Sequence, residues 1–173
     1  MRLFIALPVT ADVRRALEDT QTALRRSGAR GRFTPPENWH MTLIFLGSVP
    51  DPAPVIGAMR GIDPVRTELV FDRLTMFGSV LVALFRPDDA ADRYVRALRA
   101  ALDGAGIKYD RKAFRPHITL CRDAAFPPSL RLEACEAALR SVRLPTDKVC
   151  LMRSDLSEKT PKYTVLFTKT SNQ

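Results

Sequence analysis

The chain has 173 residues, enough for one domain, or two small lobes that share a sizeable buried core. Its 46% hydrophobic and 27% charged residues are typical of a soluble globular protein, and its formal charge of +8 favours polyanions as partners. No apolar stretch is long enough to cross a bilayer. Three widely spaced cysteines without a Cys-x-x-Cys pair predict reduced thiols and a cytoplasmic protein.

The first half of the chain predicts strands mixed with helices. Thr10 is a good helix N-cap, Gly28 a good helix stop, and Gly78-Ser79 a turn dipeptide. The expected elements are a strand at 2–7, a helix between Thr10 and Gly28, a strand at 39–46 that Gly47 closes, a short helix near 55–60, and strands at 67–77 and 80–85.

The second half predicts a similar order. Asp88 or Asp89 can cap a helix that Gly104 ends, and Pro127-Pro128 can open another. That last helix would carry one apolar stripe, made of Leu132, Cys135, Leu139 and Val142. The strands expected in this half lie at 116–122, 148–154 and 163–168, and the connection between the last two is polar and longer than a tight hairpin.

The strands at 39–46 and 116–122 each contain the same tetrapeptide, His-apolar-Thr-Leu. The chain has only two histidines, His40 and His117, and each begins one copy. The copies are 77 positions apart, and the same shift places the segment 5–7 on 82–84. A period of this length predicts two similar lobes in one bilobal domain over 1–173, related by a pseudo-twofold axis, and an α+β or mixed α/β fold.

Each motif places an imidazole beside a hydroxyl, because side chains two residues apart share one face of a strand. Two imidazoles that flank one substrate suit acid–base chemistry at phosphorus, where one accepts a proton from the nucleophile and the other protonates the leaving oxygen. Thr42 and Thr119 could donate to the non-bridging oxygens. We expect no metal or other cofactor, since no spare histidine, clustered cysteine or glycine-rich phosphate loop is present.

The two motifs, the opening segment 2–8 and the segment 114–122 closely resemble the two-histidine (2H) phosphoesterases. Within them, the chain is most similar to the bacterial RNA 2',3'-cyclic phosphodiesterases, also called 2'-5' RNA ligases. The resemblance extends over nearly the whole chain and includes Trp39–Gly47 and Tyr163. It implies an α+β, bilobal, pseudo-twofold fold with two antiparallel-type sheets flanking a central cleft and helices on the outside.

The resemblance also implies a reaction. A 2',3'-cyclic phosphate at an RNA end would be opened to a 2'-phosphomonoester without metal, and RNA ends could be joined reversibly through a 2'-5' linkage without ATP. By analogy, His40 is the general acid and His117 the general base, with the roles exchanged in reverse. Arg122 matches a family arginine that holds the phosphate or gates the cleft.

Strand alternation points Arg122 away from His117 and Thr119, so the strand must end or bulge near Cys121, or the long side chain must reach in. The first motif has no arginine at the corresponding place, which we match to Leu46-Gly47. We expect Cys121 itself to fill the core. The candidate RNA contacts are Arg115, Lys159, Lys162 and Tyr163.

Two alternatives stay open. A small cyclic nucleotide, such as the cyclic phosphate of ADP-ribose, or a 2'-5' oligoadenylate could be the substrate. A non-catalytic module that holds RNA ends is the alternative from another class. Because the internal repeat already supplies a twofold partner, we expect a monomer.

Overall fold

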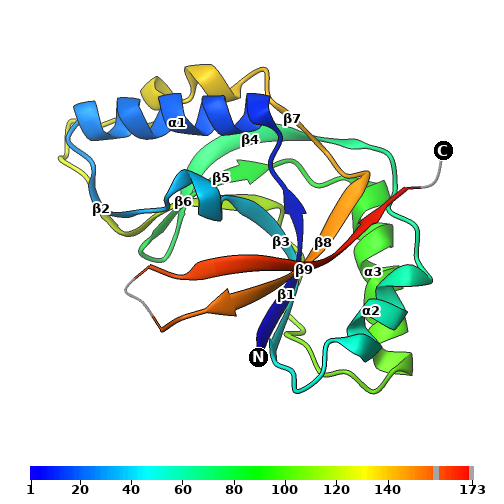
Figure 1. Ribbon diagram of the computed structural model, residues 1–173. Coiled ribbons are helices and arrows are strands. Elements are labelled where there is room, and N and C mark those ends of the chain that lie inside the picture. Colours follow the sequence, from blue (N-terminus) through cyan, green and yellow to red (C-terminus); the bar gives the residue numbers. More distant parts are fainter. Residues whose placement is uncertain (158–159, 172–173) are drawn as a thin grey trace.

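The computed structural model describes residues 1–157 and 160–171 and shows an α+β fold with two antiparallel sheets, as expected (Figure 1). Sheet A has the strand order β3-β1-β8-β9, and sheet B has the order β2-β6-β5-β4-β7. The strands are β1 (Arg2–Pro8), β2 (Arg30–Phe33), β3 (His40–Ser48), β4 (Glu68–Phe77), β5 (Val80–Phe85), β6 (His117–Ala125), β7 (Arg143–Pro145), β8 (Lys148–Asp155) and β9 (Lys162–Thr170). The helices are α1 (Ala11–Arg26), α2 (Ala53–Arg60), α3 (Asp89–Gly104) and the short 3-10 helices η1 (Pro36–Asn38), η2 (Leu132–Cys135) and η3 (Ala137–Leu139).

Each sheet combines strands from both halves of the chain. In sheet A, β1 lies between β3 of the first half and β8 of the second, so that Ile5 is opposite both Ile44 and Leu151. In sheet B, β5 lies between β6 of the second half and β4 of the first. The hairpin β4–β5, which follows β3, has therefore joined sheet B with β6, and the hairpin β8–β9, which follows β6 and β7, has joined sheet A with β3.

The long helices form where the sequence predicts them because their caps are satisfied. The Thr10 hydroxyl accepts the N–H of Val13 at the start of α1, and Asp88 accepts the N–H of Ala91 at the start of α3. Gly28 has φ +93°, the left-handed conformation that ends helices and that glycine adopts most easily. Within the described residues, no helix is long and apolar enough to cross a membrane.

The helices pack on the outer faces of the sheets. α1 contacts η2 and η3, while α2 and α3 contact each other at the other end of the molecule (Figure 1). Gln21 on α1 donates from Nε2 to the carbonyl of Leu120 on β6 at 3.1 Å, which ties this helix to sheet B. α3 contacts β3 and α2 contacts β9, so these two helices cover sheet A.

The helix predicted after Pro127-Pro128 is wrong, because the segment forms η2, η3 and β7 instead. Its predicted apolar stripe is nevertheless the side that packs inward, since Cys135, Leu139 and Val142 are buried. Two adjacent residues anchor the segment in different places. The Cys135 sulfur lies 3.8 Å from the Ser27 hydroxyl on α1, and the Glu136 carboxylate accepts the Leu74 N–H of β4 at 2.8 Å. These tertiary contacts override the helical pattern.

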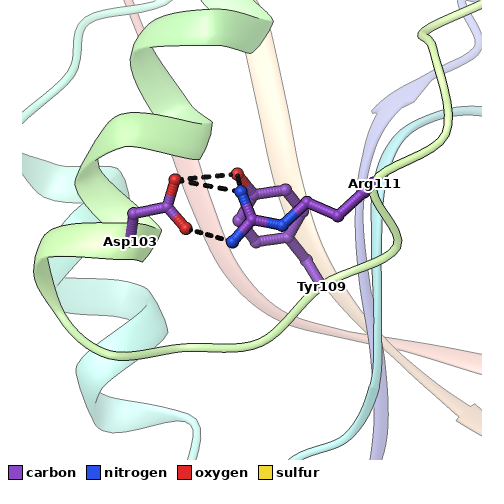
Figure 2. Close-up of polar contacts among 3 residues, drawn as sticks. All are labelled: Asp103, Tyr109 and Arg111. Atoms are coloured by element: carbon purple, nitrogen blue, oxygen red, sulfur yellow. Dashed lines mark hydrogen bonds and ion pairs between the residues drawn. The ribbon is translucent and has the colours of Figure 1, made fainter.

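The loop between α3 and β6 is braced by three side chains (Figure 2). Arg111 pairs with Asp103 at the end of α3, with one N···O distance of 2.6 Å. The Tyr109 hydroxyl donates to Asp103 at 3.0 Å, and the Arg111 guanidinium lies 4.2 Å from the centre of the Tyr109 ring. The hydrogen bond from Arg111 holds the pKa of Asp103 below its usual range. These contacts hold the loop that leads to the second histidine.

Candidate active site

The two histidines begin the two motif strands, and these strands touch. His40 is the first residue of β3, His117 is the first residue of β6, and β3 and β6 are in contact although they belong to different sheets. The charge of His117 acts on His40, and the charge of Arg122 acts on both imidazoles. The fold therefore brings the two histidines and Arg122 within electrostatic range of one another.

A hydrogen bond to a backbone carbonyl holds each of the two imidazoles in the same tautomer. Nδ1 of His40 lies 2.8 Å from the carbonyl oxygen of Asn38, and Nδ1 of His117 lies 2.6 Å from the carbonyl oxygen of Arg115. A carbonyl can only accept, so each Nδ1 carries a hydrogen. In the neutral ring, Nε2 is then the basic nitrogen, which can take or return a proton.

His40 lies among aromatic rings and is partly buried. Its ring centre is 4.7 Å from that of Phe4 and 5.1 Å from that of Tyr163, which meets it edge-on. Its Nε2 is 3.1 Å from the Thr42 hydroxyl, which donates to it when the imidazole is neutral. Burial lowers the pKa of His40 from 6.5 to about 4, and the positive charges of His117 and Arg122 add to the effect.

His117 is the more accessible of the two imidazoles. The Phe77 ring lies 5.0 Å from it, and the Arg115 guanidinium covers Phe77 at 3.9 Å. Among the residues that the structure describes, nothing hydrogen-bonds to its Nε2. Burial lowers the pKa of His117, and the charges of Arg115 and Arg122 act in the same direction. The surroundings of both imidazoles are thus cationic, which favours an anionic ligand.

A bulge explains how Arg122 reaches the histidines. On β6, Thr119 is opposite Val82 and Cys121 is opposite Leu81, so Leu120 is an extra residue. Leu120 and Cys121 are both buried and Arg122 is exposed, as expected when a bulge reverses the alternation. Of the explanations considered from the sequence, the bulge near Cys121 is the one found. Cys121 belongs to the hydrophobic core, as expected.

The position matched to Arg122 in the first motif has to be corrected. β3 bulges at the equivalent residue, because Thr42 is opposite Ala6 and Ile44 is opposite Ile5, which leaves Leu43 extra. The counterpart of Arg122 is therefore Phe45, not Leu46-Gly47. The shift of 77 that places His117 on His40 also places Arg122 on Phe45, and because both strands bulge at the same step the match is preserved.

The other candidate residues have different positions. Thr119 lies two residues after His117 on β6 and is partly exposed. Tyr163 is the second residue of β9. Burial raises its pKa, and the positive charges of Arg122 and Arg2 lower it by less. Lys162 is exposed next to it, opposite Asp155. Lys159 lies outside the described residues.

Asn38, Phe4 and Phe77 are site residues that the sequence reasoning missed. Asn38 is buried, and besides its carbonyl bond to His40 it donates from Nδ2 to the carbonyl of Pro161 at 2.7 Å, just before β9. It thereby links His40 to the segment that carries Tyr163. Asn38 could have been found from its spacing, since it precedes His40 by the two residues that separate Arg115 from His117.

The described residues hold no group of three or more His, Cys, Asp or Glu side chains arranged to bind a metal ion. The groups gathered around the two histidines are hydroxyl, guanidinium and aromatic. Of these, the hydroxyl and guanidinium groups bind phosphate oxygens by hydrogen bonds and charge.

Comparison with known proteins gives a consistent family. The chain matches the family described as LigT-like phosphoesterase twice, over residues 7–86 and 84–163, once for each motif. An RNA 2',3'-cyclic phosphodiesterase of Thermus thermophilus is 32% identical and aligns with 96% of this chain and 88% of its own. One of Geobacillus stearothermophilus is 30% identical over 92% of this chain, but the chain spans only about half of that relative's length (54%).

Solved structures show the same fold. A crystal structure of a Thermus thermophilus protein is 30% identical, with a TM-score of 0.74, and the match covers 99% of this chain and 98% of that one. Apo LigT of E. coli has a TM-score of 0.79 with the same coverage, and at 22% identity it speaks for the fold alone.

Proposed function

Because the chain belongs to the LigT-like phosphoesterases, we propose that it is an RNA 2',3'-cyclic phosphodiesterase, which opens a terminal 2',3'-cyclic phosphate to a 2'-phosphomonoester. One observation carries the proposal. Two imidazoles with identical tautomers lie within the field of the same arginine, Arg122, at the meeting point of two motif strands. This is the arrangement that in-line displacement at phosphorus requires, with a base on one side and an acid on the other.

In the proposed reaction, Nε2 of His117 accepts a proton from water as the water oxygen bonds to phosphorus. The bond from phosphorus to the 3' oxygen breaks, and Nε2 of His40 gives that oxygen its proton. Nε2 of His117 has no hydrogen-bond partner among the described residues, since the bond to the Arg115 carbonyl uses Nδ1, and this suits a base that must meet water. Hydroxyls of Thr42 and Thr119 and the guanidinium of Arg122 would stabilise the charge that gathers on the non-bridging oxygens.

The pKa of His40 bears on its role as the acid. With a pKa of about 4, it is neutral at pH 7 in the free protein. A bound phosphodiester carries a negative charge, which favours the imidazolium and raises this pKa. His40 would therefore become an acid only when substrate lies beside it.

Further parts of the proposal concern the cellular setting. The same two imidazoles, with exchanged roles, would join a 2',3'-cyclic phosphate end to a 5' hydroxyl through a 2'-5' linkage. We propose a monomer of one bilobal domain that acts on RNA in the cytoplasm. The burial of Cys121, Cys135 and Cys150 suits thiols that pack as small apolar groups.

The test is hydrolysis of a short RNA that ends in a 2',3'-cyclic phosphate, in the presence of EDTA, with the 2'- and 3'-phosphate products resolved by chromatography. We expect turnover to the 2'-phosphate. Formation of the 3'-phosphate would contradict the proposed leaving group. If the folded protein turned over only a mononucleoside cyclic phosphate, ADP-ribose cyclic phosphate or 2'-5' oligoadenylate, RNA would not be its substrate, and turnover of none would leave a binding module.

The pH dependence follows from the two lowered pKa values. The rate increases as pH rises through the pKa of the imidazole that must be neutral, the base. It decreases as pH rises through the pKa of the imidazole that must be protonated, the acid. Burial lowers both pKa values below 6.5. We therefore expect a bell-shaped profile of kcat/KM, which reports the free protein, with its maximum on the acid side of pH 6.5, and a kcat profile displaced to higher pH.

Nuclear magnetic resonance can check the same values directly. With only two histidines, the chain gives two imidazole signals, and a single-histidine variant assigns them. We expect the His40 signal to titrate near pH 4. A kcat/KM profile that is flat from mildly acid to mildly alkaline pH would rule out two titrating imidazoles.

A further inference from the structure

The two motif strands differ in charge at one equivalent position. Both strands bulge at the same step of the motif, at Leu43 and Leu120, and both return to the histidine side three residues after the threonine. In the second strand the residue there is Arg122, a cation that acts on both imidazoles. In the first strand it is Phe45, which has no charge to offer a phosphate.

A neighbouring strand places a cation over this phenylalanine. The guanidinium carbon of Arg2 on β1 lies 4.6 Å from the centre of the Phe45 ring, a cation–π contact that holds the side chain on this side of the sheet. Arg2 alternates with Phe4, whose ring meets His40, so the two side chains share a face of β1. The aromatic ring of Phe45 thus orients Arg2 at the place that corresponds to Arg122 on the second motif strand.

Arg2 also lies in one cross-strand row with Tyr163. Arg2 is opposite Ser154 on β8, and Ser154 is opposite Tyr163 on β9. Residues directly opposite one another share a face and interact. The charges of both Arg122 and Arg2 act on the Tyr163 hydroxyl, so both arginines lie within electrostatic range of this tyrosine. Since Tyr163 also meets the edge of His40, the row continues outward from the histidines.

A surface hollow of about 410 Å³ lies beside Arg2 and gives a ligand room. Arg153 and Ser154 of β8 line it as well. Asp155 is the acidic residue of its lining, and its carboxylate accepts the N–H of Ser157 at 2.9 Å. Two guanidinium groups against one engaged carboxylate give the hollow a positive balance.

We propose that Arg2 binds the backbone phosphate of the nucleotide that precedes the cyclic phosphate, and so makes the protein prefer an RNA chain to a mononucleotide. This inference rests on the proposed function and adds a specificity-determining residue to it. Arg122 serves the reacting phosphate beside the imidazoles. Arg2, on the far side of Tyr163, binds the next phosphate along the RNA chain. A mononucleoside cyclic phosphate lacks this second phosphate.

The test compares two substrates in two variants. Arg2→Gln replaces the guanidinium with a shorter, neutral polar side chain, and Arg96→Gln makes the same change on the exposed side of α3, which covers the other face of sheet A. For an oligoribonucleotide with a cyclic phosphate end, we expect Arg2→Gln to lower kcat/KM about tenfold. For the mononucleoside 2',3'-cyclic phosphate we expect less than about a twofold change. Arg96→Gln should change neither.

Salt adds a second readout. Losing one phosphate contact to single-stranded RNA should make the slope of log kcat/KM against log salt less negative by about 0.7 for the oligonucleotide. Equal losses for both substrates would mean that Arg2 acts at the reacting centre or on folding, and no loss for either would mean that it binds no phosphate. Both results overturn the proposal.

Binding of the 2'-phosphorylated oligonucleotide, followed by fluorescence anisotropy, separates this inference from the function on which it rests. Absence of hydrolysis by the unaltered protein would refute the proposed activity, whereas the Kd of Arg2→Gln against that of Arg96→Gln tests Arg2 without turnover. We expect a Kd about tenfold weaker for Arg2→Gln alone. An unchanged Kd, or no binding by the unaltered protein, would overturn the assignment.

Discussion

Replacing either His40 or His117 with alanine lowers kcat/KM for an RNA 2',3'-cyclic phosphate by about a thousandfold, and replacing both costs little more than replacing one. In the proposed reaction each imidazole handles a proton that no other described side chain is placed to handle, and the two act on one displacement, so their effects do not multiply. The measurement is the initial rate of 2'-phosphate formation in EDTA by the three variants and the unaltered protein.

The single variants also assign the roles. If His40 is the acid, the alkaline limb of the kcat/KM profile disappears in His40→Ala, and the acid limb disappears in His117→Ala. The opposite pattern would reverse the assignment. Because the His40 ring packs against Phe4 and Tyr163, His40→Gln and thermal unfolding serve as controls for packing. A folded variant that kept more than a tenth of the activity would refute two-histidine catalysis.

Replacing Gly31 with alanine lowers the free energy of unfolding by about 3 kcal/mol and displaces Arg122. Gly31 has φ +142°, a conformation that side chains strain, and it lies in the irregular pairing between β2 and β6. An added Cβ would be 2.6 Å from the sulfur of Cys121 and 2.7 Å from the carbonyl oxygen of Arg122. The two strands must separate there, which moves the backbone that carries Arg122, the arginine proposed to bind phosphate.

Gly57 provides the matched control. It lies inside α2 with nothing within 4 Å of an added Cβ, so Gly57→Ala should keep full activity and be slightly stabilising, by about 0.5–1 kcal/mol. Urea unfolding and kcat/KM of both variants make the comparison. If Gly31→Ala were as stable and as active as Gly57→Ala, the close approach of β2 to β6 would have no role in placing Arg122.

Local signals were enough to predict the motif strands and the long helices. Thr10 and Asp88 cap where they were expected to, and the segments at 5–7 and 82–84, matched by the internal repeat, both lie beside a motif strand. β2 was not predicted from the sequence, because its residues Arg30–Phe33 are mostly exposed and show no apolar alternation. An edge strand of this kind is defined by its partner, in this case β6, more than by its own side chains.

The site required more than local signals. Strand alternation alone points Arg122 the wrong way, and only the extra residue at Leu120 turns it toward the histidines. A bulge forms because of the register between β5 and β6, which depends on both strands and cannot be read from either. The same holds for Asn38, whose bond to Pro161 joins residues 123 positions apart.

The exchange of strands between the two sheets has a consequence for how the protein folds. β1 needs β8, from almost the other end of the chain, and β5 needs β6 from the second half, so a fragment that ended after β5 would leave open sheet edges. Closing such long loops costs entropy before any contact compensates, which slows folding and makes it all-or-none. The repeat is therefore not two modules in series. His40 lies on β3 of sheet A and His117 on β6 of sheet B, so the two imidazoles meet only when both sheets have formed.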